Sequence, residues 1–272
     1  WKFPYLAGEM GGAAFILIYL LFLLIMGIPV LVCEFAIGRA SRYSIAEAFE
    51  TLEPEGTKWH WTKWIGILGS YLLMMFYTTV AGWMLYYCFR NIRGDFAEAG
   101  TKEVEAGFSQ MLGNAPVMGL WTFILITAGF GICWFGIQNG IEKVSKVMMS
   151  VLFLIMIVLA VRSVFLEGAG EGVRFYLIPD FQKMQEIGIG NVIFGAMSQA
   201  FFTLSIGIGA MMIFGSYLGK ERSLTGEALS ITILDTFVAT MAGFIIIPTC
   251  FAYGIEPGSG PSLIFLTIPN IF

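Results

Sequence analysis

The chain has 272 residues, of which 57% are apolar and 12% charged, with a formal net charge of −4 and a mean hydropathy of +0.80. Soluble domains carry about a quarter charged residues, so this composition argues against a water-soluble globule, a disordered segment and a nucleic-acid binder. The single histidine and the four scattered cysteines are too few for a histidine-ligated metal centre or a disulfide framework. The composition therefore predicts a membrane protein.

Both ends of the sequence suggest an excerpt from a longer protein. The chain begins at Trp1 without an initiator methionine or a signal-peptide pattern, and it ends at Phe272 inside apolar sequence. We therefore expect a single transmembrane domain over 1–272 that is completed by segments lying outside this range.

Uncharged runs of about 20 apolar residues are typical of helices that cross a bilayer. Six such helices are predicted, after a short N-terminal piece that ends near Gly11 and Gly12, at 10–33, 64–89, 106–141 (chiefly 117–135), 147–161, 187–219 and 236–255. Loops are expected at 53–56, 94–116, 167–185 and 257–261. Lysine and arginine are spread almost evenly over the two alternating sets of loops, so the positive-inside rule does not orient the chain.

The run over 187–219 is longer than one straight span needs. Its centre, residues 201–209, holds hydroxyls and glycines, which lower helix propensity. One interpretation is a long tilted helix whose small residues allow close packing. The other is a helix that is broken at mid-membrane, where its freed backbone groups bind a substrate or an ion, because hydrocarbon cannot satisfy them.

Four polar side chains interrupt the apolar runs, namely Tyr77, Thr203, Ser205 and Asp235. The hydroxyl of Thr203 and freed carbonyls suit Na⁺ or an ammonium group, although such hydroxyls also bond carbonyls one turn earlier. An intramembrane Asp235 costs about 2.5–3.5 kcal/mol and predicts a functional partner, unless the residue lies near the membrane edge. Tyr77 lies too deep for an interfacial belt, so its phenol needs a buried partner.

Short motifs recur in order along nearly the whole chain. They are Trp1 to Tyr5, Glu9 to Phe15, Gly27 to Pro29, Glu34 to Arg39, Tyr77 with Ala81-Gly82-Trp83, Gln199 to Gly209, Ser216-Tyr217, and Asp235 with Ala242-Gly243. Jointly they resemble the neurotransmitter:sodium symporter family, which includes the bacterial leucine transporter. The resemblance implies an all-α polytopic membrane protein, part of a 5+5 inverted-repeat fold with discontinuous first and sixth helices. The chain would run from the outer half of the first helix to the loop after the seventh.

The resemblance also implies an activity. The whole protein would not be an enzyme; it would carry amino acids, neutral and hydrophobic or aromatic ones in particular, across the membrane by sodium-coupled symport and alternating access. Its partners would be the amino acid, sodium ions, the lipid bilayer and the remainder of the same chain. The lack of a glycosylation sequon and the short loop after the third family helix favour a prokaryotic inner membrane.

Family position implies roles for individual residues. Thr203 and Asp235 would bind the sodium ion nearest the substrate carboxylate. The phenol of Tyr77 would bond that carboxylate, and the substrate site as a whole would comprise Leu73, Tyr77, Phe202, Thr203, Ser205 and Ile208. Leu73, Phe202 and Ile208 would line the pocket for the substrate side chain, where familiar members often carry phenylalanine in place of Ile208.

Four further residues would gate or support the site. Lys2 matches an outer-gate arginine, although a headgroup anchor is an alternative and lysine lacks the forked geometry of arginine. Glu34 would brace the unwound helices, or would simply mark the membrane boundary. Tyr217 matches an inner-gate residue, or is an interface residue. Gln199 belongs to the motif around the break.

Chloride is not expected to be required. Chloride-dependent members bind the anion with residues that match Tyr19, Gln199 and Thr203, together with a serine where this chain has Ala239. An alanine side chain cannot bind chloride, and Asp235 already supplies a fixed negative charge.

Two other classes of function are alternatives. A non-transporting channel or scaffold would share the polar membrane positions, but a channel needs a ring of polar residues along a pore, which the sequence does not show. A membrane enzyme needs clustered nucleophiles, histidines or paired carboxylates, and Glu34 and Asp235 are the clear intramembrane acids.

Overall fold

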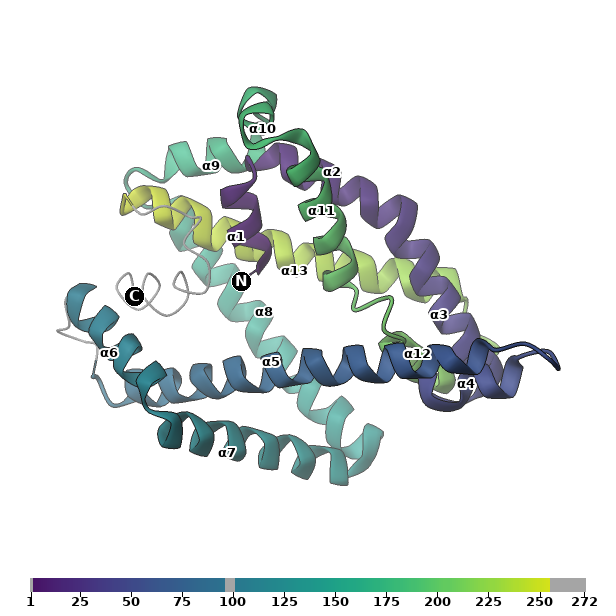
Figure 1. Ribbon diagram of the computed structural model, residues 1–272. Coiled ribbons are helices and arrows are strands. Elements are labelled where there is room, and N and C mark those ends of the chain that lie inside the picture. The colour runs from purple at the N-terminus through teal and green to yellow at the C-terminus, as the bar shows by residue number, and fades with distance from the viewer. Residues whose placement is uncertain (1, 96–100, 255–272) are drawn as a thin grey trace. The chain divides into compact units, whose positions relative to one another are not determined.

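The computed structural model describes residues 2–95 and 101–254, and these residues form helices and their connections without a strand (Figure 1). Trp1 and the loop predicted over 257–261 lie outside the described residues. Local sequence signals, such as capping side chains and glycines, explain where several of these helices begin and end.

The first part of the chain forms two short helices, α1 (Lys2–Glu9) and α4 (Ile45–Leu52), one on each side of a long helical segment. That segment runs through α2 (Ala13–Phe22), the π-helical turn η1 (Leu23–Gly27) and α3 (Ile28–Ser41). After α1, Gly11 and Gly12 take positive φ values of 90° and 61°, a conformation that glycine adopts without steric cost. Pro29, which has no backbone N–H to donate, lies in the first turn of α3, directly after the π-helical turn.

The middle of the chain holds the longest helices. They are the 3₁₀ turn η2 (Trp59–Trp61), α5 (Thr62–Ile92), α6 (Thr101–Gly113), α7 (Ala115–Trp134), the π-helical segment η3 (Ile137–Glu142) and α8 (Lys143–Val164). Asn114 caps α7, because its side chain accepts a hydrogen bond from the Val117 N–H at 3.3 Å. The prediction of a plain loop over 94–116 is wrong, since α6 lies there. Its charged helix-forming residues leave no uncharged run that would mark it.

The last described part again alternates short and long helices. They are α9 (Ala169–Leu177), α10 (Phe181–Ile187), α11 (Ile189–Thr203), α12 (Ala210–Tyr217) and α13 (Leu224–Ala252). The predicted loop over 167–185 is therefore wrong as well. Asp180 starts α10 by accepting hydrogen bonds from the N–H groups of Gln182 and Lys183, both at 3.0 Å, which is how an N-cap residue nucleates a short helix.

Five helical segments within the described residues are long and apolar enough to cross a membrane. They are Ala13–Ser41, Trp59–Ile92, Ala115–Trp134, Gly140–Val164 and Leu224–Ala252. Each overlaps one of the predicted runs. The remaining predicted run, 187–219, is divided into α11 and α12, drawn in green in Figure 1. The broken helix is thus confirmed, and the alternative of one long tilted helix is wrong.

The chain divides into two compact units. The first comprises Trp1–Gly8, Met74–Arg174 and Met241–Phe272. Within it, the Ser163 hydroxyl on α8 donates to the Ile245 carbonyl on α13 at 2.6 Å and also bonds the Thr249 hydroxyl. These bonds tie α8 to the part of α13 that contains Pro248.

The second unit comprises Glu9–Leu73 and Phe175–Thr240. In it α11 packs along α2, and α12 packs along α3. Glycines permit the second contact: a Cβ atom added at Gly38 would overlap the Met212 carbonyl oxygen, and one at Gly215 would lie 2.7 Å from the Phe35 carbonyl oxygen. The two half-helices are therefore held against successive parts of one long helical segment.

Candidate functional site

The interruption between α11 and α12 covers residues 204–209. Gly207 and Gly209 have φ values of 90° and 71°, and Ser205 has a φ of 52°, which is uncommon for a residue with a Cβ atom. The N–H of Ile206 still bonds the Phe201 carbonyl at 3.2 Å. The backbone therefore leaves the helix in a compact turn and becomes helical again at Ala210.

Glu34 connects α3 to this interruption. The Gly207 N–H donates to its Oε1 at 2.6 Å, and the Met211 N–H donates to its Oε2 at 3.1 Å. Both N–H groups lack intrahelical partners because the helix is broken before them. A carboxylate at the N-terminus of α12 is also favoured by the helix dipole. Glu34 is 5% exposed, so its side chain faces the turn and not a solvated boundary.

Buried oxygen atoms gather where α11 ends. The Nε2 of Gln199 donates to the Oγ1 of Thr203 at 3.0 Å, and Gln199 is 2% exposed. Three other buried oxygens, Gln199 Oε1, Asp235 Oδ2 and Thr236 Oγ1, have no hydrogen bond of regular geometry among the described residues. Buried oxygens without such a bond are costly unless a proton donor or a cation meets them.

The fully buried ring of Tyr19 joins these residues into one cluster. Its hydroxyl interacts with the side chains of Thr203, Thr236 and Asp235. The cluster therefore draws on α2, α11 and α13. Amide, hydroxyl and carboxylate oxygens are the ligands that hard cations prefer. Asp235 lies about three turns into α13, so it does not lie at the end of that helix.

A second, apolar group lies beside residue 208. A Cβ atom added at Gly69 on α5 would lie 2.9 Å from the Cγ2 of Ile208, and one at Gly66 would lie 2.8 Å from the Ile208 carbonyl oxygen. Leu73 follows Gly69 by one helical turn, and Leu73, Phe202 and Ile208 are all half-buried. Side chains one turn apart share a helix face, so α5 presents Leu73 on the side where Ile208 packs.

The remaining predicted residues lie elsewhere in the chain. Lys2, the first residue of α1, and Tyr77 on α5 belong to the first unit. Tyr77 is 43% exposed, and its ring lies edge-on to Phe76 with 5.9 Å between centroids. Tyr217, the last residue of α12, is 66% exposed, which fits either of its two interpretations.

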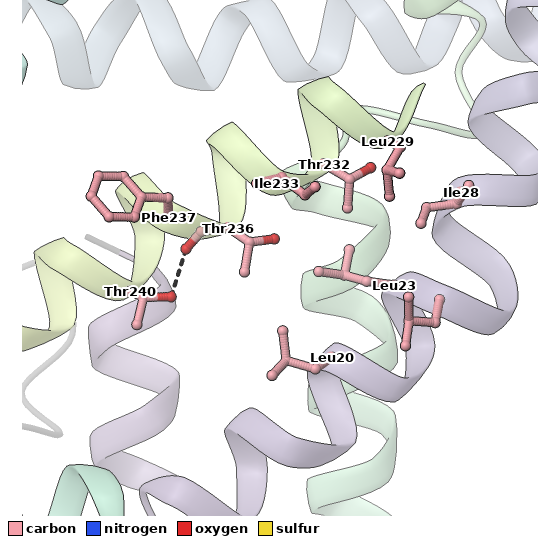
Figure 2. A pocket seen from close by; sticks show the side chains of 10 residues that line it. Leu20, Leu23, Ile28, Leu229, Thr232, Ile233, Thr236, Phe237 and Thr240 are labelled. Carbon is pink, nitrogen blue, oxygen red and sulfur yellow. Dashed lines mark hydrogen bonds between the residues drawn. The ribbon is translucent and has the colours of Figure 1, made fainter. Parts of the chain in front are cut away.

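A separate cavity of about 440 Å³ lies within the second unit (Figure 2). It is lined by Leu20, Leu23, Leu24, Ile28, Leu229, Thr232, Ile233, Thr236, Phe237 and Thr240. None of the residues predicted to bind substrate or sodium lines it. The hydroxyls of Thr240 and Thr232 donate to the carbonyls of Thr236 and Ala228 at 2.6 and 2.8 Å. The lining residues other than the three threonines are leucine, isoleucine or phenylalanine, so the cavity wall is mostly apolar.

Sequence reasoning missed Thr236. Its hydroxyl is one of the buried oxygens of the cluster and lies next to Tyr19. The available signal was its place next to Asp235 in a helix, flanked by Thr232 and Thr240 at intervals of four residues. That spacing marks one helix face as hydroxyl-rich.

The model of the sodium:neurotransmitter symporter family matches residues 1–104 and 108–254. The chain belongs to this family. Among its relatives, the uncharacterized sodium-dependent transporter YhdH of Bacillus subtilis is 38% identical over 100% of this chain and 59% of that protein. An uncharacterized sodium-dependent transporter of Haemophilus influenzae is 35% identical over 100% of this chain and 61% of its own length.

A solved structure is equally similar. The crystal structure of MhsT in complex with L-phenylalanine superposes with a TM-score of 0.91 at 38% identity, covering 100% of this chain and 60% of MhsT. The expected class of an all-α, multi-pass membrane protein with this transporter fold is therefore confirmed. The chain spans about three fifths of the length of these relatives.

Proposed function

We propose that the complete protein is a sodium-coupled symporter of amino acids with apolar or aromatic side chains, working by alternating access. The observation that carries the proposal is the cluster of buried oxygens from Gln199, Asp235 and Thr236 beside the broken helix. Membership of the symporter family and relatives named as sodium-dependent transporters support the sodium coupling. The phenylalanine bound to MhsT supports the class of substrate.

In this proposal Thr203 and Asp235 ligate a sodium ion. A desolvated Na⁺ needs oxygen ligands and a nearby negative charge, and Asp235 has a buried oxygen without a regular hydrogen bond. Gln199 positions Thr203, because its amide donates to the Thr203 hydroxyl. Both lone pairs of a hydroxyl oxygen can accept, so that bond leaves one for the ion.

The amino acid binds at the interruption. The turn around Ser205 leaves backbone groups available for its ammonium and carboxylate groups, and the phenol of Tyr77 bonds the carboxylate. Leu73, Phe202 and Ile208 surround its side chain. Glu34 holds the shape of the turn, while Lys2 and Tyr217 act at the outer and inner gates.

Chloride is not needed in this mechanism. Ala239 offers no hydroxyl to an anion, and the carboxylate of Asp235 supplies the negative charge that balances sodium. A chloride ion next to that carboxylate would be repelled.

The test is uptake of labelled L-phenylalanine by the full-length protein in liposomes under an inward sodium gradient. We expect accumulation that stops when choline replaces sodium and that continues when gluconate replaces chloride. Asp235→Ala and Thr203→Val should each lower uptake about tenfold or more, as expected when a ligand to a charge is lost. The control Thr127→Val changes a hydroxyl on α7 that bonds the Phe123 carbonyl one turn earlier. Uptake that ignores the sodium gradient would overturn the proposal.

A further inference from the structure

Position 69 on α5 has no room for a side chain. A Cβ atom there would lie 2.9 Å from Ile208 Cγ2 and 3.7 Å from Ile208 Cβ. Real side chains do not approach that closely, so any residue larger than glycine must move Ile208. The contacted atom is a branch at Cβ, and β-branched side chains are stiff at χ1. Ile208 therefore cannot yield by simply rotating a distant atom.

The backbone on the other side of Ile208 is packed just as tightly. The side chain of Ile45, the first residue of α4, would overlap a Cβ added at Gly66 and a Cβ added at Gly209. Ile45 is 9% exposed and packs with Met212. The 208–209 backbone is thus held between Ile45 and α5, so a Cβ atom at position 69 displaces the side chain of Ile208 and not its backbone.

That face of α5 also carries Leu73, one turn after Gly69. A displaced Ile208 therefore changes the space next to Leu73. The contact between Gly69 and the Ile208 side chain is purely apolar. A methyl group at position 69 therefore adds volume next to Ile208 and adds no polar interaction.

We propose that Gly69 determines how large a substrate side chain the site accepts, by fixing the position of Ile208. The inference rests on the proposed function, because it takes Leu73, Phe202 and Ile208 as the walls of the side-chain pocket. Gly69 is a positioning residue: it does not touch the substrate and acts through Ile208. The glycine keeps the pocket wide enough for bulky apolar and aromatic amino acids.

The experiment compares large and small substrates in the full-length protein in liposomes. Gly69→Ala should raise the KM for L-tryptophan uptake about tenfold, the size expected for an overpacked methyl group, while the KM for L-alanine changes by less than about twofold. Gly129→Ala on α7, where a Cβ meets nothing within 4 Å, is the matched control and should leave the ratio of the two KM values unchanged.

A second pair of variants separates pocket size from general damage. Ile208→Ala removes the contacted methyl, so it should lower the ratio of the tryptophan KM to the alanine KM. Gly69→Ala in that background should have no further effect, because the two sites are coupled only through the Ile208 side chain. This double variant carries no clash and also covers the case in which Gly69→Ala alone does not fold.

The outcomes separate the two proposals. Absence of sodium-driven uptake of any amino acid by the unmodified protein would overturn the proposed function. If uptake is sodium-driven, the role of Gly69 alone is overturned by either of two results: Gly69→Ala leaves the tryptophan-to-alanine ratio unchanged, or it shifts that ratio equally with and without the Ile208→Ala substitution. A raised ratio that disappears in the Ile208→Ala background supports the role.

Discussion

Glu34 satisfies two backbone N–H groups with two different carboxylate oxygens. Because Gly207 lies inside the interruption and Met211 lies in the first turn of α12, one side chain fixes both the turn and the start of the half-helix. An amide at this position could accept only one of the two bonds, and its NH₂ group would face the other N–H.

Glu34→Gln should therefore destabilise the protein by about 1.5–3 kcal/mol, the usual cost of losing a hydrogen bond to a charged group. The free energy of unfolding can be followed in detergent by denaturant titration. Glu47→Gln makes the same change at an exposed carboxylate on α4 and should have almost no effect. Equal effects of the two substitutions would contradict the role assigned to Glu34.

One side of α3 contacts α12 from the N-terminus of α12 to its C-terminus. Glu34, Gly38 and Arg42 recur every four residues and so lie on one side of α3 and its C-cap. Glu34 meets the N-terminus of α12, Gly38 its middle, and Arg42 its C-terminus, where the guanidinium donates to the carbonyls of Ser216 and Leu218 at 2.9 and 3.1 Å. Negative charge at the first end and positive charge at the last both complement the helix dipole.

The close crossing of α3 and α12 depends on Gly38. Gly38→Ala should lower the free energy of unfolding by about 1–3 kcal/mol, since its methyl group would overlap the Met212 carbonyl and backbone cannot yield as a side chain can. Gly119→Ala on α7, where a Cβ meets nothing within 4 Å, should be neutral or stabilise by up to about 1 kcal/mol through helix propensity. Thermal unfolding of both variants checks the contrast, and a stable Gly38→Ala protein would refute it.

The folded state of the complete protein should be stabilised by a bound cation. Ligand that binds only the folded protein at a hundred times its dissociation constant adds about 2.7 kcal/mol. We therefore expect a higher melting temperature in sodium chloride than in choline chloride, measured in detergent. In Asp235→Ala the difference between the two salts should vanish, whereas Thr127→Val should keep it. A sodium effect that survives in Asp235→Ala would place the ion elsewhere.

The apolar runs and the broken helix were predictable, because both rest on local composition: uncharged stretches for the spans, and hydroxyls with glycines for the break. Helices α6, α9 and α10 were not, since short helices with charged residues leave no such run. The contacts of Gly38 and Gly215 were equally hidden. With 33 glycines in the chain, sequence cannot say which ones lie where two backbones approach.

Site residues were predictable from the sequence where a polar residue interrupts an apolar pattern. They were not predictable where the packing of helices determines which side chains face the site. Asp235 stands out in an apolar helix, but Thr236 is one hydroxyl among several on α13, and its inward direction depends on how that helix faces Tyr19. The closeness of Gly69 to Ile208 joins segments far apart in the chain, so it follows only from tertiary structure.

The π-helical turn at Leu23–Gly27 has a consequence for the helix that contains it. A π turn holds about one residue more than an α turn, so it rotates everything after it by about 100° relative to a regular helix. Tyr19 precedes this turn, while Glu34 and Gly38 follow it. One continuous helix thus faces α11 with the part before the π turn and α12 with the part after it. The single extra residue of that turn, in an aliphatic stretch of sequence, sets the rotation between the two parts.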